Sequence, residues 1–252
     1  MTRPDANTPA PFSAADAPLT PVSGAPAPAD GSPDRERSHV PAVERAADRL
    51  PDALEQAREY IAAGEVGAAL TALRALIARE PRNAGARVTL AALLERRGDL
   101  DGALNELGRA VEISPDDVEV LRARAALLTA RGKYDQAETD LRRAARVDER
   151  NADVQLQLGV LFCKRARWRE AIEPLRAAVA VDPDRFAGHY YLGDAYNSID
   201  DLPAALNAYR AAAAIDPTHV RALKAIGVVL DRLRRPLEAE AAYQRARDAQ
   251  RR

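Results

Sequence analysis

Residues 189–217 carry two apolar stripes with the spacing of amphipathic helices, separated by a polar break at 198–201. The first stripe consists of Leu192, Gly193 and Tyr196, and the second of Ala205, Tyr209 and Ala212. Residues three and four apart lie on one side of a helix, so each stripe predicts a helix with one apolar face. Pro203 fits a first helical turn, and Pro217 cannot continue a helix. The stretch therefore predicts a hairpin of two helices that bury their apolar faces against each other.

The same pattern recurs with a period of 34 residues from Leu50 onward. A frame that starts there gives six units: 50–83, 84–117, 118–151, 152–185, 186–219 and 220–252. The eighth place of each unit is small: Ala57, Ala91, Ala125, Gly159, Gly193 and Gly227. The twentieth is always alanine: Ala69, Ala103, Ala137, Ala171, Ala205 and Ala239. Larger residues fill the twenty-fourth: Leu73, Leu107, Leu141, Leu175, Tyr209 and Tyr243. Helices approach to about 8–10 Å only where small side chains face each other, so this spacing predicts closely packed pairs.

These places resemble the tetratricopeptide repeat family, whose unit is a helix–turn–helix of 34 residues. The resemblance covers residues 50–252 and implies an all-α fold. The implied architecture is an α-solenoid, a right-handed superhelix of six stacked repeats whose first helices line a concave groove. We assign residues 42–252 to this repeat domain. The chain departs from the family pattern at Gln56 and Arg124, where leucine is usual, at Leu76, where a small residue is usual, and at Glu149, where proline is usual.

The turn and cap residues agree with this frame. Asn83, Asp117 and Asn151 stand where a side-chain oxygen caps the first helix of the next unit. Gly64, Gly98 and Gly132 fall in the turn between the two helices of a unit, where a positive φ is often needed. Pro174 lies further inside a predicted second helix, where it removes one backbone hydrogen bond.

Residues 1–41 differ in composition from the rest of the chain. They hold nine of the 17 prolines, together with Ala, Ser, Asp and Gly, and Phe12 is their one aromatic residue. Such a segment buries too little apolar surface to offset the entropy of ordering it. We predict a disordered N-terminal tail, which is either a solvated tail or a tether for another protein.

Composition and charge narrow the class of partner. Lys+Arg 37 against Asp+Glu 38 leave a formal net charge of −1, so no global field steers the chain to nucleic acid or to an anionic membrane. The single cysteine, Cys163, excludes an internal disulfide and fits a reducing compartment. No run approaches the ~20 apolar residues of a membrane span, and the N-terminus lacks a signal-peptide pattern. We expect a cytoplasmic protein.

No arrangement of residues predicts catalysis. Cys163 and His189 form the one candidate nucleophile–base pair, but their predicted heights along the helix axes differ by about a dozen ångströms at ~1.5 Å per residue. The three histidines have no ligand spacing with cysteine or carboxylates, and no glycine-rich phosphate loop is present. We therefore expect a non-enzymatic protein without a cofactor or a catalytic or metal site.

The family resemblance places certain first-helix residues in the groove, and the C-terminal half is chemically richer. The predicted peptide-binding residues are Leu156, Val160, Tyr190, Asp194, Asn197, Arg221, Lys224 and Val228. They offer an apolar floor, an aromatic ring, an amide and two cations. The alternative is structural: Asp194 pairs with Lys224 or Arg221, and Tyr190 packs between helices. The Lys and Asn pattern of repeat proteins that clamp chaperone C-termini is missing in the registers that start in units 3, 4 and 5.

These observations predict an interaction scaffold or adaptor that binds an extended peptide or a helix of a protein partner, one with an acidic group, in its groove. The alternative is a receptor or regulatory subunit whose superhelix binds a small signalling molecule or peptide. Neither nucleic acid nor a membrane is an expected partner, and the oligomeric state is left open.

Overall fold

The computed structural model describes residues 53–251, and within that range it contains helices and turns but no strand. The helices are α2 (Ala53–Ala62), α3 (Val66–Arg79), α4 (Ala84–Arg96), α5 (Leu100–Ile113), α6 (Val118–Ala130), α7 (Tyr134–Val147), α8 (Ala152–Lys164), α9 (Trp168–Val181), α10 (Phe186–Ser198), α11 (Leu202–Ile215), α12 (Val220–Arg232) and α13 (Pro236–Gln250). They form six consecutive pairs, which confirms the predicted all-helical repeat fold. The predicted tail, residues 1–41, lies outside the described residues.

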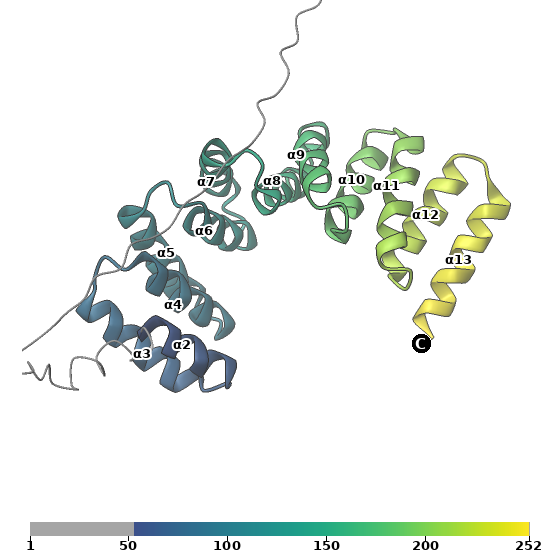
Figure 1. The fold of residues 1–252 in the computed structure, drawn as a ribbon. Helices are drawn as coiled ribbons and strands as arrows, with labels where there is room; N and C mark the ends of the chain where they lie inside the picture. The colour runs from purple at the N-terminus through teal and green to yellow at the C-terminus, as the bar shows by residue number, and fades with distance from the viewer. Residues whose placement is uncertain (1–52, 252) are drawn as a thin grey trace, which may run out of the picture. The chain divides into compact units, whose positions relative to one another are not determined.

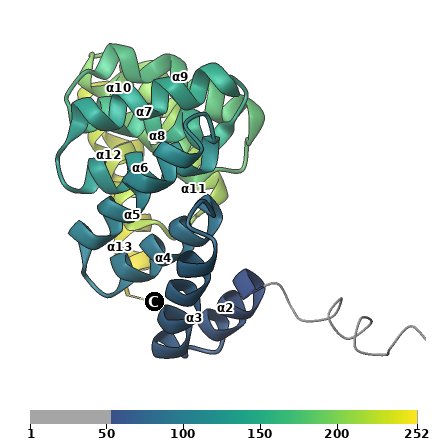
Figure 2. The same cartoon turned by 90° about the vertical axis from the view of Figure 1, so that its left-hand side faces the viewer.

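The helices pack in the order of the chain. Within each unit the first helix packs on the second, and the second packs on the first helix of the next unit. Figures 1 and 2 show this side-by-side order from two directions. The first helices α4, α6, α8 and α10 also contact one another in turn. We call the side formed by α2, α4, α6, α8, α10 and α12 the first-helix face.

The predicted contact between small and large places holds each pair together. A Cβ atom added to Gly193 would lie 2.5 Å from the Tyr209 ring, and one added to Gly227 would lie 2.4 Å from the Tyr243 ring. At Gly159 the nearest atom would be Cγ of Leu175, at 2.4 Å. The alanines of the twentieth place are likewise buried in all six units. The small residues therefore set how closely the two helices of a unit approach.

Capping groups begin the first helices where the sequence predicts. The side chain of Asn83 accepts a hydrogen bond from the Ala86 amide, and Asn151 accepts one from Val154. Asp117 accepts from the amides of Glu119 and Val120. These bonds satisfy backbone amides of the first turn that have no partner within the helix. Each cap therefore fixes the residue at which its helix begins.

The turns between paired helices require a positive φ in every unit. Glycine provides it in the first three units, with φ of +78° at Gly64, +83° at Gly98 and +72° at Gly132. In the last three units the same place is taken by non-glycine residues, Ala166, Asp200 and Arg234, at φ of 55°, 70° and 58°. A side chain in this region costs about 1–2 kcal/mol, so the C-terminal turns carry strain that the N-terminal turns avoid.

Arginine ion pairs join neighbouring units at recurring places. Arg131 pairs with Asp101, and Arg165 pairs with Asp135, at 2.6 and 2.9 Å; each arginine stands in the fourteenth place and each aspartate in the eighteenth of the preceding unit. Glu138, whose side chain is mostly buried, accepts from Arg165 and Arg167. Exposed ion pairs contribute up to about 1 kcal/mol each, so they supply only a small part of the stability. Their main effect is to align neighbouring units.

Replacing Gly132 with alanine tests the turn geometry. Gly132→Ala places a Cβ at φ +72°, and we expect it to lower the free energy of unfolding by about 1 kcal/mol. Gly67→Ala is the matched control, because Gly67 lies inside α3 and a Cβ there meets nothing within 4 Å. The control should raise stability by about 0.5 kcal/mol. Urea titration measures both, and equal effects of the two variants would contradict the assignment.

Candidate functional site

The structure places the predicted peptide-binding residues on three first helices. Leu156 and Val160 belong to α8; Tyr190, Asp194 and Asn197 to α10; Arg221, Lys224 and Val228 to α12. Helices α8 and α10 pack directly on each other. The residues of α8 and α10 are half-buried, whereas those of α12 are exposed. The set therefore combines a partly buried floor with a cationic edge.

Two contacts join α10 to α12, one near each end. At the start of α12, the His219 ring lies 5.8 Å from the Tyr190 ring and 4.3 Å from the Phe186 ring, centroid to centroid. At the end of α12, Arg232 donates to the backbone carbonyl and the side-chain oxygen of Asn197. Asn197 is therefore engaged within the protein, and its donor and acceptor groups are only partly available to a ligand.

The Tyr190 ring is held by an aromatic cluster that the sequence did not predict. Its neighbours are Phe186 at 5.7 Å, Tyr191 at 5.9 Å, Tyr209 at 5.8 Å and His219 at 5.8 Å between ring centroids. Burial raises the pKa of Tyr190, with a further rise from Asp194 and an opposing effect from Arg221. Tyr190 thus packs between helices and is half-buried, which fixes its ring in one orientation.

Asp194 is a carboxylate held in a poorly hydrated position. Its Oδ1 accepts a hydrogen bond from the Tyr209 hydroxyl at 2.5 Å, and Tyr209 is almost fully buried. Burial raises the pKa of Asp194, and the smaller effect of the Tyr209 hydrogen bond opposes that rise. Among the described residues Asp194 forms an ion pair with neither Arg221 nor Lys224. Its charge is therefore balanced by one neutral donor only.

The two cations of α12 are available on the surface. Arg221 and Lys224 are exposed, and no carboxylate of residues 53–251 forms an ion pair with either of them. The Arg221 charge reaches Tyr190, where it favours the ionised phenol. Arginine can bind a carboxylate through two parallel hydrogen bonds, and lysine acts as a point charge. This edge of the site suits an acidic group.

The sulfur of Cys163 is placed as a structural group. Cys163 is buried, and its thiol lies 3.9 Å from the backbone oxygen of Tyr191, toward which it donates. Burial raises the pKa of Cys163 to about 12, with a smaller contribution from Asp194. The His189 ring instead bonds the Pro183 carbonyl at 2.9 Å. At neutral pH the thiol is therefore protonated, and His189 does not act as its base. In residues 53–251 no cluster of three or more His, Cys, Asp or Glu could hold a metal ion.

Comparison with known families agrees with this architecture. Two models described as tetratricopeptide repeat match the sequence, one over residues 60–127 and the other over 156–220 and 199–251. Together they take up more than half of the chain. The chain belongs to the tetratricopeptide repeat family. No curated protein matches it. The fold of this family generally mediates interactions between proteins.

Solved structures of other repeat proteins share the fold. MamA from Desulfovibrio magneticus RS-1 matches with a TM-score of 0.63 at 22% identity, over 67% of this chain and 95% of that one. YrrB, described as a TPR protein with an unusual peptide-binding site, matches with a TM-score of 0.62 at 21% identity, over 71% and 92%. A tetratricopeptide repeat protein from Parabacteroides merdae matches with a TM-score of 0.63 at 16% identity, over 75% of each chain. No helix in the described part of this chain is both long and apolar enough to cross a membrane.

The opposite pKa shifts of two aspartates provide a test of the Asp194 environment. The raised pKa of Asp194 means that the folded state holds this proton more tightly than the unfolded state. Stability from this group is therefore lost as pH rises from its ordinary pKa of about 3.9 through the folded value. Asp194→Asn keeps an acceptor for Tyr209 without the charge. The stability of this variant relative to the natural protein should therefore increase as pH rises from acidic to neutral.

Asp153→Asn is the control with the opposite sign. The Arg185 hydrogen bond lowers the pKa of Asp153, so its stabilising contribution is present at neutral pH and lost as pH falls. This variant should lose stability relative to the natural protein as pH rises. Urea titration at a series of pH values measures both differences. A pH dependence of the same sign for the two variants would contradict the described environment of Asp194.

Proposed function

We propose that the first-helix face of units 4 to 6 binds an extended peptide or a helix of a partner protein, so that the chain works as a non-enzymatic scaffold. The observation that carries this proposal is the combination of Tyr190 and Asp194. A ring fixed by four aromatic neighbours stands four residues before a half-buried carboxylate that has one neutral donor. Burying a carboxylate without a cation costs stability, and a donor supplied by a partner would offset that cost.

The neighbouring residues give the partner its chemistry. Leu156 and Val160 of α8 are half-buried apolar residues, suited to an apolar anchor beside Tyr190. An N–H or cationic group of the partner would lie at Asp194, and an acidic group at Arg221 and Lys224. This alternation favours a partner segment with an apolar residue, a donor and a carboxylate in succession. That YrrB has a peptide-binding site supports the view that an array of this fold can hold a peptide.

The span of the site sets the length of the segment. First helices of neighbouring units are separated by about one helix diameter, ~10 Å, and an extended peptide covers ~3.3 Å per residue. Contacts across α8, α10 and α12 therefore need roughly six to nine residues. Exposed Val228, near the end of this span, would contact an apolar terminal residue.

Substitutions at Tyr190 and Lys224 test the proposed surface against peptides selected from a display library on the natural protein. Tyr190→Ala should weaken binding by about 30-fold, close to 2 kcal/mol, because aromatic anchors supply much of the energy of an interface. Tyr190→Phe keeps the ring and should retain most of the affinity. Isothermal titration calorimetry measures these changes.

Lys224→Glu should weaken binding about 10-fold or more at low salt, and the loss should shrink at high salt because the interaction is electrostatic. Arg169→Glu is the matched charge control, since Arg169 is an exposed residue of the second helix α9 and should have little effect. If peptides bind equally well to Tyr190→Ala and Lys224→Glu, the binding surface lies elsewhere and the proposal fails.

A further inference from the structure

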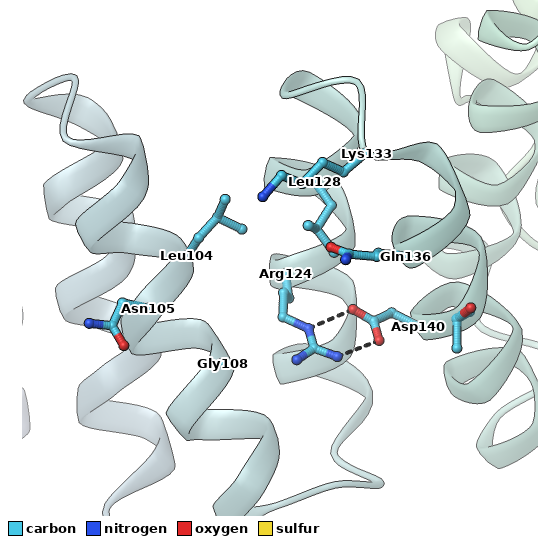
Figure 3. Close-up of a pocket in the computed structure, with 9 residues that line it drawn as sticks. Leu104, Asn105, Gly108, Arg124, Leu128, Lys133, Gln136 and Asp140 are labelled. Carbon is cyan, nitrogen blue, oxygen red and sulfur yellow. Dashed lines mark hydrogen bonds and ion pairs between the residues drawn. The ribbon is translucent and has the colours of Figure 1, made fainter.

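A cavity between second helices lies apart from the predicted peptide-binding residues. This cavity of about 540 Å³ opens between the second helices α5 and α7, and residues of the first helix α6 also line it. Figure 3 shows its lining residues. None of the predicted peptide-binding residues belongs to it. Its volume is in the range of about 300–1,000 Å³ that is typical of small-molecule sites.

The floor of the cavity is a buried ion pair that uses two of the three guanidinium nitrogens of Arg124. Nε and Nη2 of Arg124 donate to the two carboxylate oxygens of Asp140 at 2.7 and 2.6 Å, and Asp140 is only 3% exposed. The remaining guanidinium nitrogen, Nη1, has no hydrogen-bond partner in the described part of the chain, and in Figure 3 it points toward α5 and Gly108. A guanidinium can serve two acceptors at once, so Arg124 can hold Asp140 and also bind a ligand.

Three departures from the repeat pattern meet at this cavity. The seventh place, usually Leu, holds Arg124, and the twenty-third place holds Asp140 where units 1, 5 and 6 have alanine. The twenty-fifth place is arginine in four units, Arg74, Arg142, Arg176 and Arg210, but in unit 2 it is Gly108. A Cβ on Gly108 would meet nothing within 4 Å, so packing does not require glycine there.

Stability does not account for these departures. A glycine inside a helix lowers helix stability, and a buried ion pair is often no better than the apolar residues it replaces. Together, however, the three residues make a hollow with a charged floor. The absent Gly108 side chain provides the space, and the Arg124–Asp140 pair provides an oriented donor.

The rim determines which ligand charge is favoured. Lys133 is exposed and forms no ion pair within residues 53–251, and in Figure 3 its chain extends from the turn after α6 across Leu128 toward α5. Gln136 also lines the cavity, and in Figure 3 its amide lies next to Leu128. Asp140 is the one acid of the lining and is paired with Arg124, so Lys133 leaves the lining with a net positive charge. Leu104 and Leu128 add apolar wall.

We propose that this cavity binds a small organic carboxylate. The carboxylate lies between the Lys133 ammonium and Nη1 of Arg124 and accepts from the Gln136 amide, while the carbon chain contacts Leu104 and Leu128. The cavity shares no residue with the proposed peptide surface on α8, α10 and α12. An experiment can therefore contradict one of the two proposals and leave the other intact. An acidic side chain of a partner protein shares this chemistry and is the competing source of the carboxylate.

Nuclear magnetic resonance of the full chain tests the proposal with succinate as the probe and succinamide as its uncharged counterpart. Succinate should shift the side-chain amide signal of Gln136 and the backbone signals of residues 104–108 in a saturable way, with a dissociation constant on the order of 1 mM at low salt. Succinamide, of equal size, should cause at least tenfold weaker effects. Equal responses to the two probes, or no saturable response to succinate, would overturn the proposal.

Two variants locate the response in the cavity. Gly108→Arg restores the side chain that four other units carry at this place and should weaken succinate binding at least tenfold by filling the hollow. Gly67→Arg makes the same change at an open helical position of α3 and should leave binding unchanged. Lys133→Gln changes an exposed residue and should weaken succinate binding about fivefold. This variant tests the site even if Gly108→Arg does not fold. Unchanged affinity in Lys133→Gln and in folded Gly108→Arg would contradict the assignment.

A capped tripeptide, acetyl-Ala-Glu-Ala-amide, separates the two sources of carboxylate. Tighter binding of succinate than of the tripeptide supports a free small molecule. Binding of the tripeptide without binding of succinate would assign the cavity to a partner's side chain and overturn the small-molecule proposal.

Discussion

The close approach of the two helices within each unit is the contact on which the rest of the structure depends. It exists because the eighth and twentieth places are small and the twenty-fourth is large in all six units. A Cβ on Gly193 would already lie 2.5 Å from the Tyr209 ring, so there is no spare room. Each pair then packs on the next mainly through its second helix, which contacts the first helix of the following unit, with arginine ion pairs added. Stability in such an array is a sum of local terms, so damage to one pair acts mainly on its neighbours.

The same contact positions the proposed peptide site. Tyrosine takes the twenty-fourth place in unit 5, where four units have leucine, and its ring fills the space above Gly193. Its hydroxyl then reaches Asp194 at 2.5 Å. A packing residue therefore also fixes the carboxylate on the first-helix face. In unit 6 the Tyr243 hydroxyl also donates to an aspartate, at 2.7 Å, but this residue, Asp231, stands three places further along the first helix and is exposed.

The sequence predicted the fold in detail because the fold is local and periodic. Five first helices begin at the first residue of their predicted units, from Ala84 to Val220, and the caps at Asn83, Asp117 and Asn151 hold the predicted bonds. Helical periodicity, caps and turn glycines are all set by residues a few positions apart. The sequence also placed the eight peptide-site residues on three successive first helices, where the structure has them, but their role in binding is still a prediction.

Contacts between units were harder to predict, because they depend on side-chain directions across 30 or more residues. The ring contact between His219 and Phe186, and the hydrogen bond from Arg232 to Asn197, have no local signal. The cavity had one such signal in the sequence, because Arg124 departs from the family pattern. Its partner Asp140 and the space beside Gly108 become visible only when α5, α6 and α7 are packed together. A departure from the repeat pattern was thus the sequence feature that pointed to this cavity.

Residue-resolved hydrogen exchange of Gly193→Ala is the most direct test of the small-residue contact. The added methyl group overlaps the Tyr209 ring, and overpacking of this kind typically costs about 1–3 kcal/mol. The account predicts that amides of α10 and α11 lose the most protection, those of α12 and α13 less, and those of α2 to α5 almost none. Equal loss of protection across all helices, or no loss in α10 and α11, would contradict the claim that this contact holds each unit together.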